Sequence, residues 1–290
     1  MNETIKRKIQ FILGTFGYSI KRVDSKPLLD LRYKHNDPRL FLYYGKKPLF
    51  INVRIELGRI RFFPLSKKTN PFVYAVSETF NEKDTFNVLK SCLQQYYSLV
   101  QPENAYDWFG LEKKDAPLLS GVPAWFAPEP WEVSTVDQKR RSMERVSKSE
   151  SKKCGKKLSA SHGAKVFGPV TSEKLHTEAV RFHKTMLSIE SSGFCRHDGA
   201  DGDIEALVFV REDGQWRWQV SRGLHRLVVL TALCWRQIPL RVKNVVYRQD
   251  ADTWPNVLSG LYTKDGALKL FDRIFDGKLP ALLQRWIKRG

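Results

Sequence analysis

The sequence predicts an α+β fold in three parts: an N-terminal domain over residues 1–133, a basic connecting segment over 134–165 and an α/β module over 166–290. Two observations support this division. Short strand-like runs separated by glycine turns occupy much of the first part, whereas the last part alternates helical and strand-like spacing. Between them lies a stretch rich in Ser, Lys and Arg with almost no large apolar residues, which is typical of a flexible linker or lid.

The N-terminal domain is expected to begin with a basic amphipathic helix over residues 3–16. Such a helix either packs against its own domain or lies on an anionic membrane surface. Three short strands follow in the prediction, at 40–44, 49–55 and 59–64, and together they form a small antiparallel sheet. Helical spacing returns over 81–100, where we expect the aromatic side chains to belong to the core.

Composition favours a globular protein inside the cell. The hydrophobic fraction of 42% is ordinary for a folded chain, and no apolar run approaches the roughly 20 residues that cross a bilayer. The first residues lack the long apolar block of a signal peptide. Four cysteines without a CxxC pair indicate neither a disulfide scaffold nor a zinc site. We therefore expect a cytoplasmic protein, with the 3–16 helix offering a peripheral position at the inner face of the membrane.

The net charge of +18 predicts attraction to polyanions: nucleic acid, anionic lipid or phosphorylated molecules. The alternative is a solvated basic surface that aids solubility. Much of the excess lies between Lys139 and Lys157, inside the connecting segment. Its position just before the C-terminal module leaves open a role in closing over a bound anion. Nucleic-acid binding, if present, is expected to be non-specific.

The C-terminal module begins with a helix that Thr171 or Ser172 can cap and that Gly193 ends. A polar loop then leads into a strand over 204–210. The residues 212–214 form a hairpin turn, and the partner strand follows at 216–220. Further along, 238–242 reads as a strand, and a helix capped by Thr263 runs to a glycine at 277.

The turn from the second strand into the next helix is the candidate anion site. It reads Ser221-Arg222-Gly223-Leu224-His225-Arg226, before a helix over 227–235. The first N–H groups of a helix have no intrahelical partner, and the macrodipole makes that end positive. Gly223 lets the backbone approach a ligand closely, while His225 and Arg226 add donors. The turn is thus expected to bind a phosphate group.

In this context, Gly-x-His-Arg followed by a helix and Ile-Pro-Leu-Arg-Val resembles the N-terminal domain of ParB partition proteins and its relatives, the sulfiredoxins and free-serine kinases. The resemblance covers roughly 173–246. Members of that superfamily hold nucleotide phosphates on this turn, which implies the same role for Gly223, His225 and Arg226. It further implies a nucleoside di- or triphosphate as ligand.

The departures from that pattern concern catalysis. Sulfiredoxins have a cysteine and nucleotide-hydrolysing ParB proteins a glutamate at the position of Leu224, and the serine kinases have an aspartate where Arg222 stands. The turn therefore offers no obvious acid or base. The last 40 or so residues are instead similar to ParB-like proteins encoded among genes for cell-surface polysaccharide synthesis, whose N-terminal amphipathic helix is also similar.

We favour an enzyme: a nucleotide-dependent phosphotransferase, that is a kinase, or a nucleotide hydrolase acting on a small molecule or glycan. Such chemistry needs carboxylates to hold Mg²⁺ and to accept a proton. The candidates are Asp198, Asp201, Asp203 and Glu205, with Asp201 and Asp203 as metal ligands and Asp201, Asp203 and Glu205 as catalytic groups. The alternatives are a nucleic-acid-binding protein, with the basic segment as its clamp, and a membrane-associated scaffold in polysaccharide synthesis.

Overall fold

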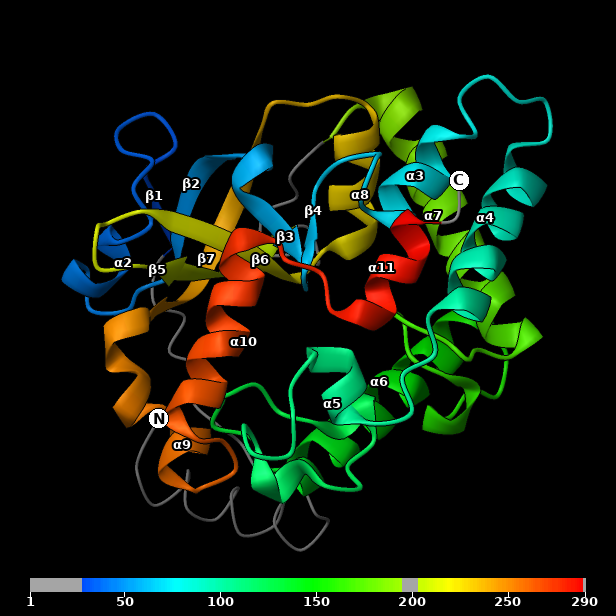
Figure 1. Cartoon of the computed structure of the whole chain (residues 1–290). Coiled ribbons are helices and arrows are strands. Elements are labelled where there is room, and N and C mark those ends of the chain that lie inside the picture. The colour runs from blue at the N-terminus through cyan, green and yellow to red at the C-terminus, as the bar shows by residue number, and fades with distance from the viewer. Residues whose placement is uncertain (1–27, 195–202, 289–290) are drawn as a thin grey trace, which may run out of the picture.

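The computed structural model describes residues 28–194 and 203–288, and these form a mixed α/β structure around one sheet of seven strands (Figure 1). The strand order is β1-β2-β7-β5-β6-β3-β4. The strands are β1 (Leu29–Asp30), β2 (Leu49–Arg54), β3 (Gly58–Ile60), β4 (Phe63–Pro64), β5 (Glu205–Val210), β6 (Trp216–Arg222) and β7 (Gln237–Tyr247). Strands from both ends of the chain therefore lie in the same sheet.

The small separate N-terminal sheet that the sequence predicts is not formed. Instead, β2 pairs antiparallel with β7 and β3 pairs parallel with β6. The reason lies in β2, where Leu49, Phe50, Ile51 and Val53 are all almost fully buried. Because neighbouring side chains point to opposite faces of a sheet, such a strand needs cover on both faces and a partner on each edge.

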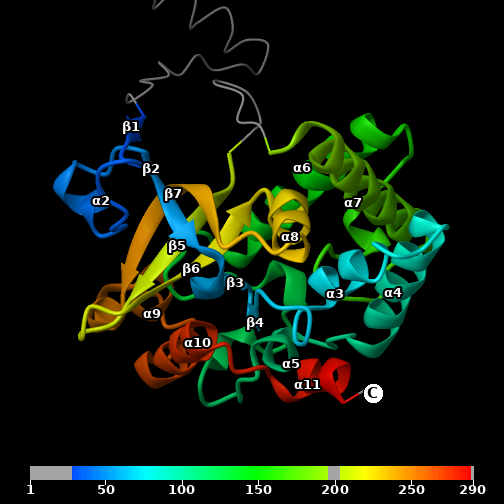
Figure 2. The ribbon, with the colours of Figure 1, turned by 90° about the horizontal axis from the view of Figure 1, so that it is seen from above.

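Helices cover both faces of the sheet (Figure 2). On one side α8 packs with α3 and α7, and α4 lies beyond them; on the other side α10 packs against the sheet beside α9. The helices are α2 (Leu40–Tyr43), α3 (Pro71–Ser77), α4 (Thr85–Leu99), α5 (Ala105–Phe109), α6 (Val136–Cys154), α7 (Ser172–Ser192), α8 (Leu224–Ala232), α9 (Pro255–Leu258), α10 (Lys264–Asp276) and α11 (Ala281–Ile287). Within the described ranges, none of them combines the length and apolar character needed to cross a membrane.

Local signals place the C-terminal elements as predicted. The side chain of Thr171 accepts a hydrogen bond from the N–H of Lys174 at the start of α7, and Thr263 caps α10 in the same way. Gly277 ends α10 in the left-handed conformation. These caps satisfy orphan backbone groups with residues that are neighbours in the sequence, which is why sequence alone locates them.

Two expected segments differ from the structure. Residues 40–44 form the short helix α2, because a turn in which Asp37 accepts from the N–H of Arg39 precedes them, and Tyr43 is 86% exposed. The connecting segment contains α6, a helix of 19 residues opened by a capping box between Thr135 and Gln138. The predicted 3–16 helix lies outside the described residues.

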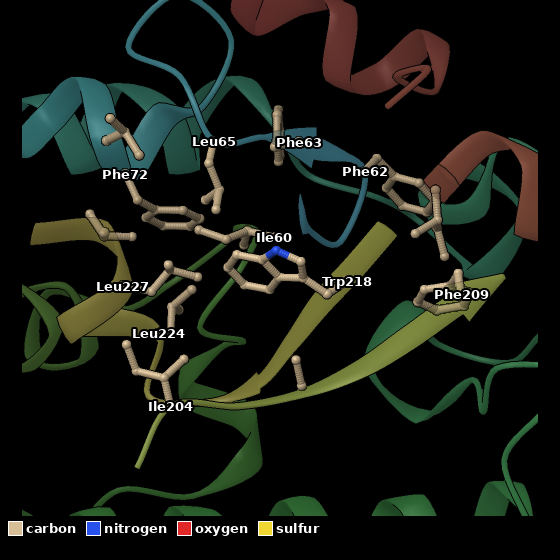
Figure 3. Close-up of a cluster of buried hydrophobic side chains, with 14 of the residues drawn as sticks. Ile60, Phe62, Phe63, Leu65, Phe72, Ile204, Phe209, Trp218, Leu224 and Leu227 are labelled. Carbon is tan, nitrogen blue, oxygen red and sulfur yellow. The ribbon is translucent and has the colours of Figure 1, made fainter. Parts of the chain in front are cut away.

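A buried cluster fixes the start of α8 on the sheet (Figure 3). Ile204, Trp218 and Leu227 are fully buried, and Leu224 is 9% exposed. The indole N–H of Trp218 donates to the carbonyl of Arg54 over 3.1 Å, so the ring has no unsatisfied donor. This packing holds the β6–α8 turn in place, and with it the candidate anion site.

Candidate functional site

The β6–α8 turn has the backbone geometry that the sequence predicts. Gly223 adopts a φ of 85° and is the N-cap of α8, where no side chain caps the helix. A Cβ at this position would lie 3.1 Å from the Cα of Ile204, so space as well as conformation favours glycine. The first N–H groups of α8 therefore lack a side-chain acceptor.

His225 does not face a ligand site on the turn, contrary to the prediction that it offers a donor to phosphate. Its Nε2 lies 2.9 Å from Oε2 of Glu178, and its ring packs edge-on against Phe182. Burial lowers the pKa of His225 despite the nearby carboxylate, so the ring is neutral near pH 7. Since a carboxylate only accepts, Nε2 carries the proton and donates it to Glu178.

Arg226 turns back toward the beginning of β5. Its Nη2 donates to the carbonyl oxygen of Asp203 over 3.2 Å, and burial lowers its pKa, with Arg222 adding repulsion. The sequence left open whether Arg226 binds phosphate or ties helix to strand through a carboxylate such as Glu205. The contact with Asp203 ties α8 to the segment before β5.

Asp203, a predicted metal ligand, and Glu205, a predicted catalytic group, lie among cations. Within 4.0 Å, Glu205 has the side-chain nitrogens of Lys243, Arg241 and Arg222, and Asp203 has Arg241 at 3.8 Å. Both side chains are largely buried. The positive charges around Asp203 and Glu205 disfavour a divalent cation at these two carboxylates.

Asp198 and Asp201 lie outside the described residues. In the described ranges, no three His, Cys, Asp or Glu side chains gather in a group that could hold a metal ion.

A cavity of about 300 Å³ lies beside the same turn, lined by Ser221 and Leu224 on one side and by the inner face of α6 on the other. Its walls include the aromatic side chains of Trp108, Phe109, Trp125 and Phe167. The cavity, called the chamber below, has a volume at the lower end of that of small-molecule sites. Sequence reasoning missed it, because its lining comes from segments more than 100 residues apart.

A buried network of charged side chains joins α6, α7 and α8 at the chamber wall. Glu150 of α6 lies 2.6 Å from the amine of Lys174 and 2.7 Å from the guanidinium of Arg181, both of α7. Glu178 in turn lies 3.0 Å from Lys174 and 3.2 Å from Arg181. With the hydrogen bond from His225, the network ties three helices together.

The pKa values in the network follow from these contacts. Burial alone would raise the pKa of Glu178, but the hydrogen bond from His225 and the charges of Lys174 and Lys165 hold it well below its ordinary value. Burial alone would lower the pKa of Lys174, but Glu178 and Glu150 outweigh it and raise it. Glu178 is thus an anion and Lys174 a cation at neutral pH.

Lys165 adds a positive charge that Glu178 and Glu150 attract without contacting it. It lines the chamber, and its amine makes no hydrogen bond or ion pair with any residue that the structure describes. The cluster contains three basic side chains, Lys165, Lys174 and Arg181, and two acidic ones, Glu150 and Glu178, so the basic groups exceed the acidic groups by one. Burial lowers the pKa of the Lys165 amine, although Glu178 and Glu150 act to raise it.

The rest of the chamber wall has balanced charges. Arg61 pairs with Glu129, and the amine of Lys139 lies 2.6 Å from Oε1 of Glu132. A further donor is nevertheless unused: within the described chain, the buried indole N–H of Trp125 has no hydrogen-bond partner. Buried donors of this kind are rare in folded proteins and call for an acceptor. The chamber therefore combines apolar walls with the amine of Lys165.

Comparison with family models, with curated proteins and with solved structures finds no match to this chain.

Proposed function

We propose that the chamber binds a phosphorylated small molecule, such as a nucleotide, whose anionic group lies against Lys165. The observation that carries the proposal is the unpaired amine of Lys165 beside a network in which every other charge is matched. The side chain of Lys165 is half-buried, and a bound anion would give its amine the direct partner that it lacks among the described residues. A charge-assisted hydrogen bond to phosphate also gains more than a neutral one.

The walls support a ligand with a flat apolar part. Trp125 and Phe167 are stacked with ring planes 11° apart, and Trp108 lies 4.5 Å from Phe167 between ring centroids. Aromatic walls of this kind favour planar, polarisable ligands such as a nucleobase. Leu224, the first residue of α8, also lines the chamber, so the positive end of that helix lies near the ligand's anionic group.

A ParB/sulfiredoxin-like relationship for residues 166–290 remains part of the proposal. It is supported by the order α7, β5, β6, glycine turn, α8 and β7, in which β5 pairs antiparallel with β6 and parallel with β7. On this basis the proposed activity is phosphotransfer or nucleotide hydrolysis, with a small-molecule or glycan acceptor. Glu150 is the carboxylate on the chamber wall, and it is held by Lys174 and Arg181.

Calorimetry with the full-length protein tests the binding. The probes are inorganic phosphate, a sugar phosphate and nucleoside mono-, di- and triphosphates, each with and without Mg²⁺. Lys165→Met should weaken binding of the best probe about ten- to a hundredfold, the value of one charge-assisted contact. The exposed Lys113→Met serves as the matched control.

Two outcomes would overturn the proposal. Unchanged affinity in Lys165→Met would show that the ligand does not bind at Lys165 in the chamber. Loss of binding in Arg226→Ala alone would instead place it on the outer side of the turn, with Arg222 and Arg241. Release of inorganic phosphate from the best-bound nucleotide, with and without an acceptor, tests the reaction separately.

A further inference from the structure

The two faces of α6 have different chemistry. The inner face lines the chamber with Ser142, Met143, Val146, Ser147 and Glu150. The outer face presents Arg141, Arg145, Lys148 and Lys152, all exposed. These four residues are called the α6 stripe below. The inner face fixes the helix to the protein, so the orientation of the stripe is set by the fold rather than by the helix alone.

The stripe is continuous. Its residues are separated by four, three and four positions, which places them on one side of an α-helix. At 1.5 Å per residue the stripe is about 16 Å long. Arg140, Lys156 and Lys157 are exposed beside it or just beyond the helix end, so the positive surface continues past both ends of the stripe.

Two exposed carboxylates of the same helix, Asp137 and Glu144, lie four positions from Arg141 and Lys148 and reduce the positive charge of the stripe without reversing it. None of the four side chains forms an ion pair with a described residue, whereas Lys139 on the same helix pairs with Glu132. Arg141 and Arg145 are four positions apart, as are Lys148 and Lys152, and like charges at that spacing repel. A polyanion laid along the stripe would relieve this repulsion.

We infer that the α6 stripe docks the phosphate backbone of nucleic acid, without reading its sequence. A row of cations matched to a regular row of phosphates gives affinity by releasing counter-ions, and it carries no base-specific contact. This inference does not depend on the chamber having a ligand.

A membrane surface fits the stripe less well. Helices that lie on membranes insert an apolar face between the headgroups. The apolar residues of α6 instead line the chamber; Val146 is 42% exposed, and no large aromatic side chain accompanies the stripe on α6. The outer face of α6 therefore offers cationic side chains that can contact phosphates, but few apolar side chains that could insert into lipid.

Fluorescence anisotropy with labelled duplexes of two unrelated sequences tests the inference. The stripe variant replaces Arg141, Arg145, Lys148 and Lys152 with Gln, which favours helix. The matched control replaces the exposed Lys46, Lys47, Lys83 and Lys113 with Gln and so removes the same charge. Both sequences should bind the wild type equally, and affinity at low salt should fall more than about tenfold in the stripe variant alone.

The salt dependence gives a second measure. The slope of log affinity against log salt should become shallower by about 3 to 4 in the stripe variant, which corresponds to four lost phosphate contacts. Equal losses of affinity in both variants would show that net charge alone causes the binding, and this would overturn the inference. So would absence of wild-type binding, or a stripe variant that keeps DNA but no longer binds phosphatidylserine-containing vesicles.

Discussion

Two regions on opposite sides of the sheet differ in the kind of side chain that they contain. The face covered by α10 is aromatic: Trp131, Phe209, Trp254 and Phe271 contact one another with ring centroids 4.9–6.2 Å apart. The opposite side, where α6, α7 and α8 meet, contains the network around Glu150, Lys174 and Glu178 at the wall of the chamber. The first region is packed from aromatic rings, whereas the second contains side chains of both charges.

The difference separates stability from recognition. Burying aromatic area stabilises the fold wherever shape permits. Burying charges is unfavourable unless each is paired, and replacing a buried ion network by apolar residues is often neutral or stabilising. A charged network with one surplus cation at the chamber wall makes the fold less stable at that place. Local losses of stability of this kind are common at functional sites.

The largest effect is expected on the aromatic face. Phe271 is fully buried among four aromatic rings, and Phe271→Ala should lower the free energy of unfolding by about 4 kcal/mol through lost burial and a cavity. Urea denaturation measures it. Leu258→Ala, at a position 72% exposed, is the control and should change stability by less than about 0.5 kcal/mol. A small effect of Phe271→Ala would mean that this face does not provide the main core.

Breaking the charged network should have a slightly smaller effect. Glu178→Gln removes an anion that Lys174, Arg181 and His225 all contact. Glu150 alone is then left to compensate Lys174 and Arg181, and the free energy of unfolding should fall by about 3 kcal/mol. Glu144→Gln, an exposed carboxylate on α6, provides the control. If the two variants are equally stable, the network is not a structural unit.

Removing the surplus charge should change stability in the opposite direction. Lys165→Met takes away a cation that has no partner among the described residues and keeps an apolar chain of similar length, so the free energy of unfolding should rise by about 1 kcal/mol. The same variant should lose ligand affinity. A gain in stability with a loss of binding is the combination that distinguishes a ligand-binding lysine from a structural one. Destabilisation by Lys165→Met would contradict the charge balance.

The smallest effect is expected from pH, and it concerns only the charged face. His225 has a folded pKa below its ordinary 6.5, so as pH falls through that region the unfolded chain takes up the proton first and stability declines. Glu178, whose pKa lies well below its ordinary 4.5, contributes stability that is lost at still lower pH.

Unfolding curves measured between pH 8 and pH 5 test the first part of that decline. It should be reduced in His225→Gln, which has no ring to titrate. Phe271→Ala should keep the wild-type pH profile at a lower overall stability. A profile that changes in Phe271→Ala but not in His225→Gln would assign the acid sensitivity to another group.

The sequence by itself determined the elements whose signals are local. The caps at Thr171 and Thr263, the stop at Gly277 and the strand–glycine–helix turn at Gly223 depend on residues a few positions apart. Hydrogen bonds between near neighbours are encoded in short motifs, so α7, β5, β6, α8 and α10 could be recognised without coordinates, whereas the short helix α9 could not. The positive charge between Lys139 and Lys157 was equally readable, although its helical form was not.

Tertiary structure alone decided how distant segments combine. The pairing of β2 with β7 joins residues nearly 200 positions apart, and it merged two expected sheets into one. The role of His225 depends on the position of Glu178, to which it donates a hydrogen bond. The surplus charge of Lys165 can be recognised only from the structure, because it is there that Glu150 pairs with Lys174 and Arg181. Charge compensation and burial depend on all residues that lie nearby in space. A sequence pattern shows only which residues are neighbours along the chain, so it cannot predict either property.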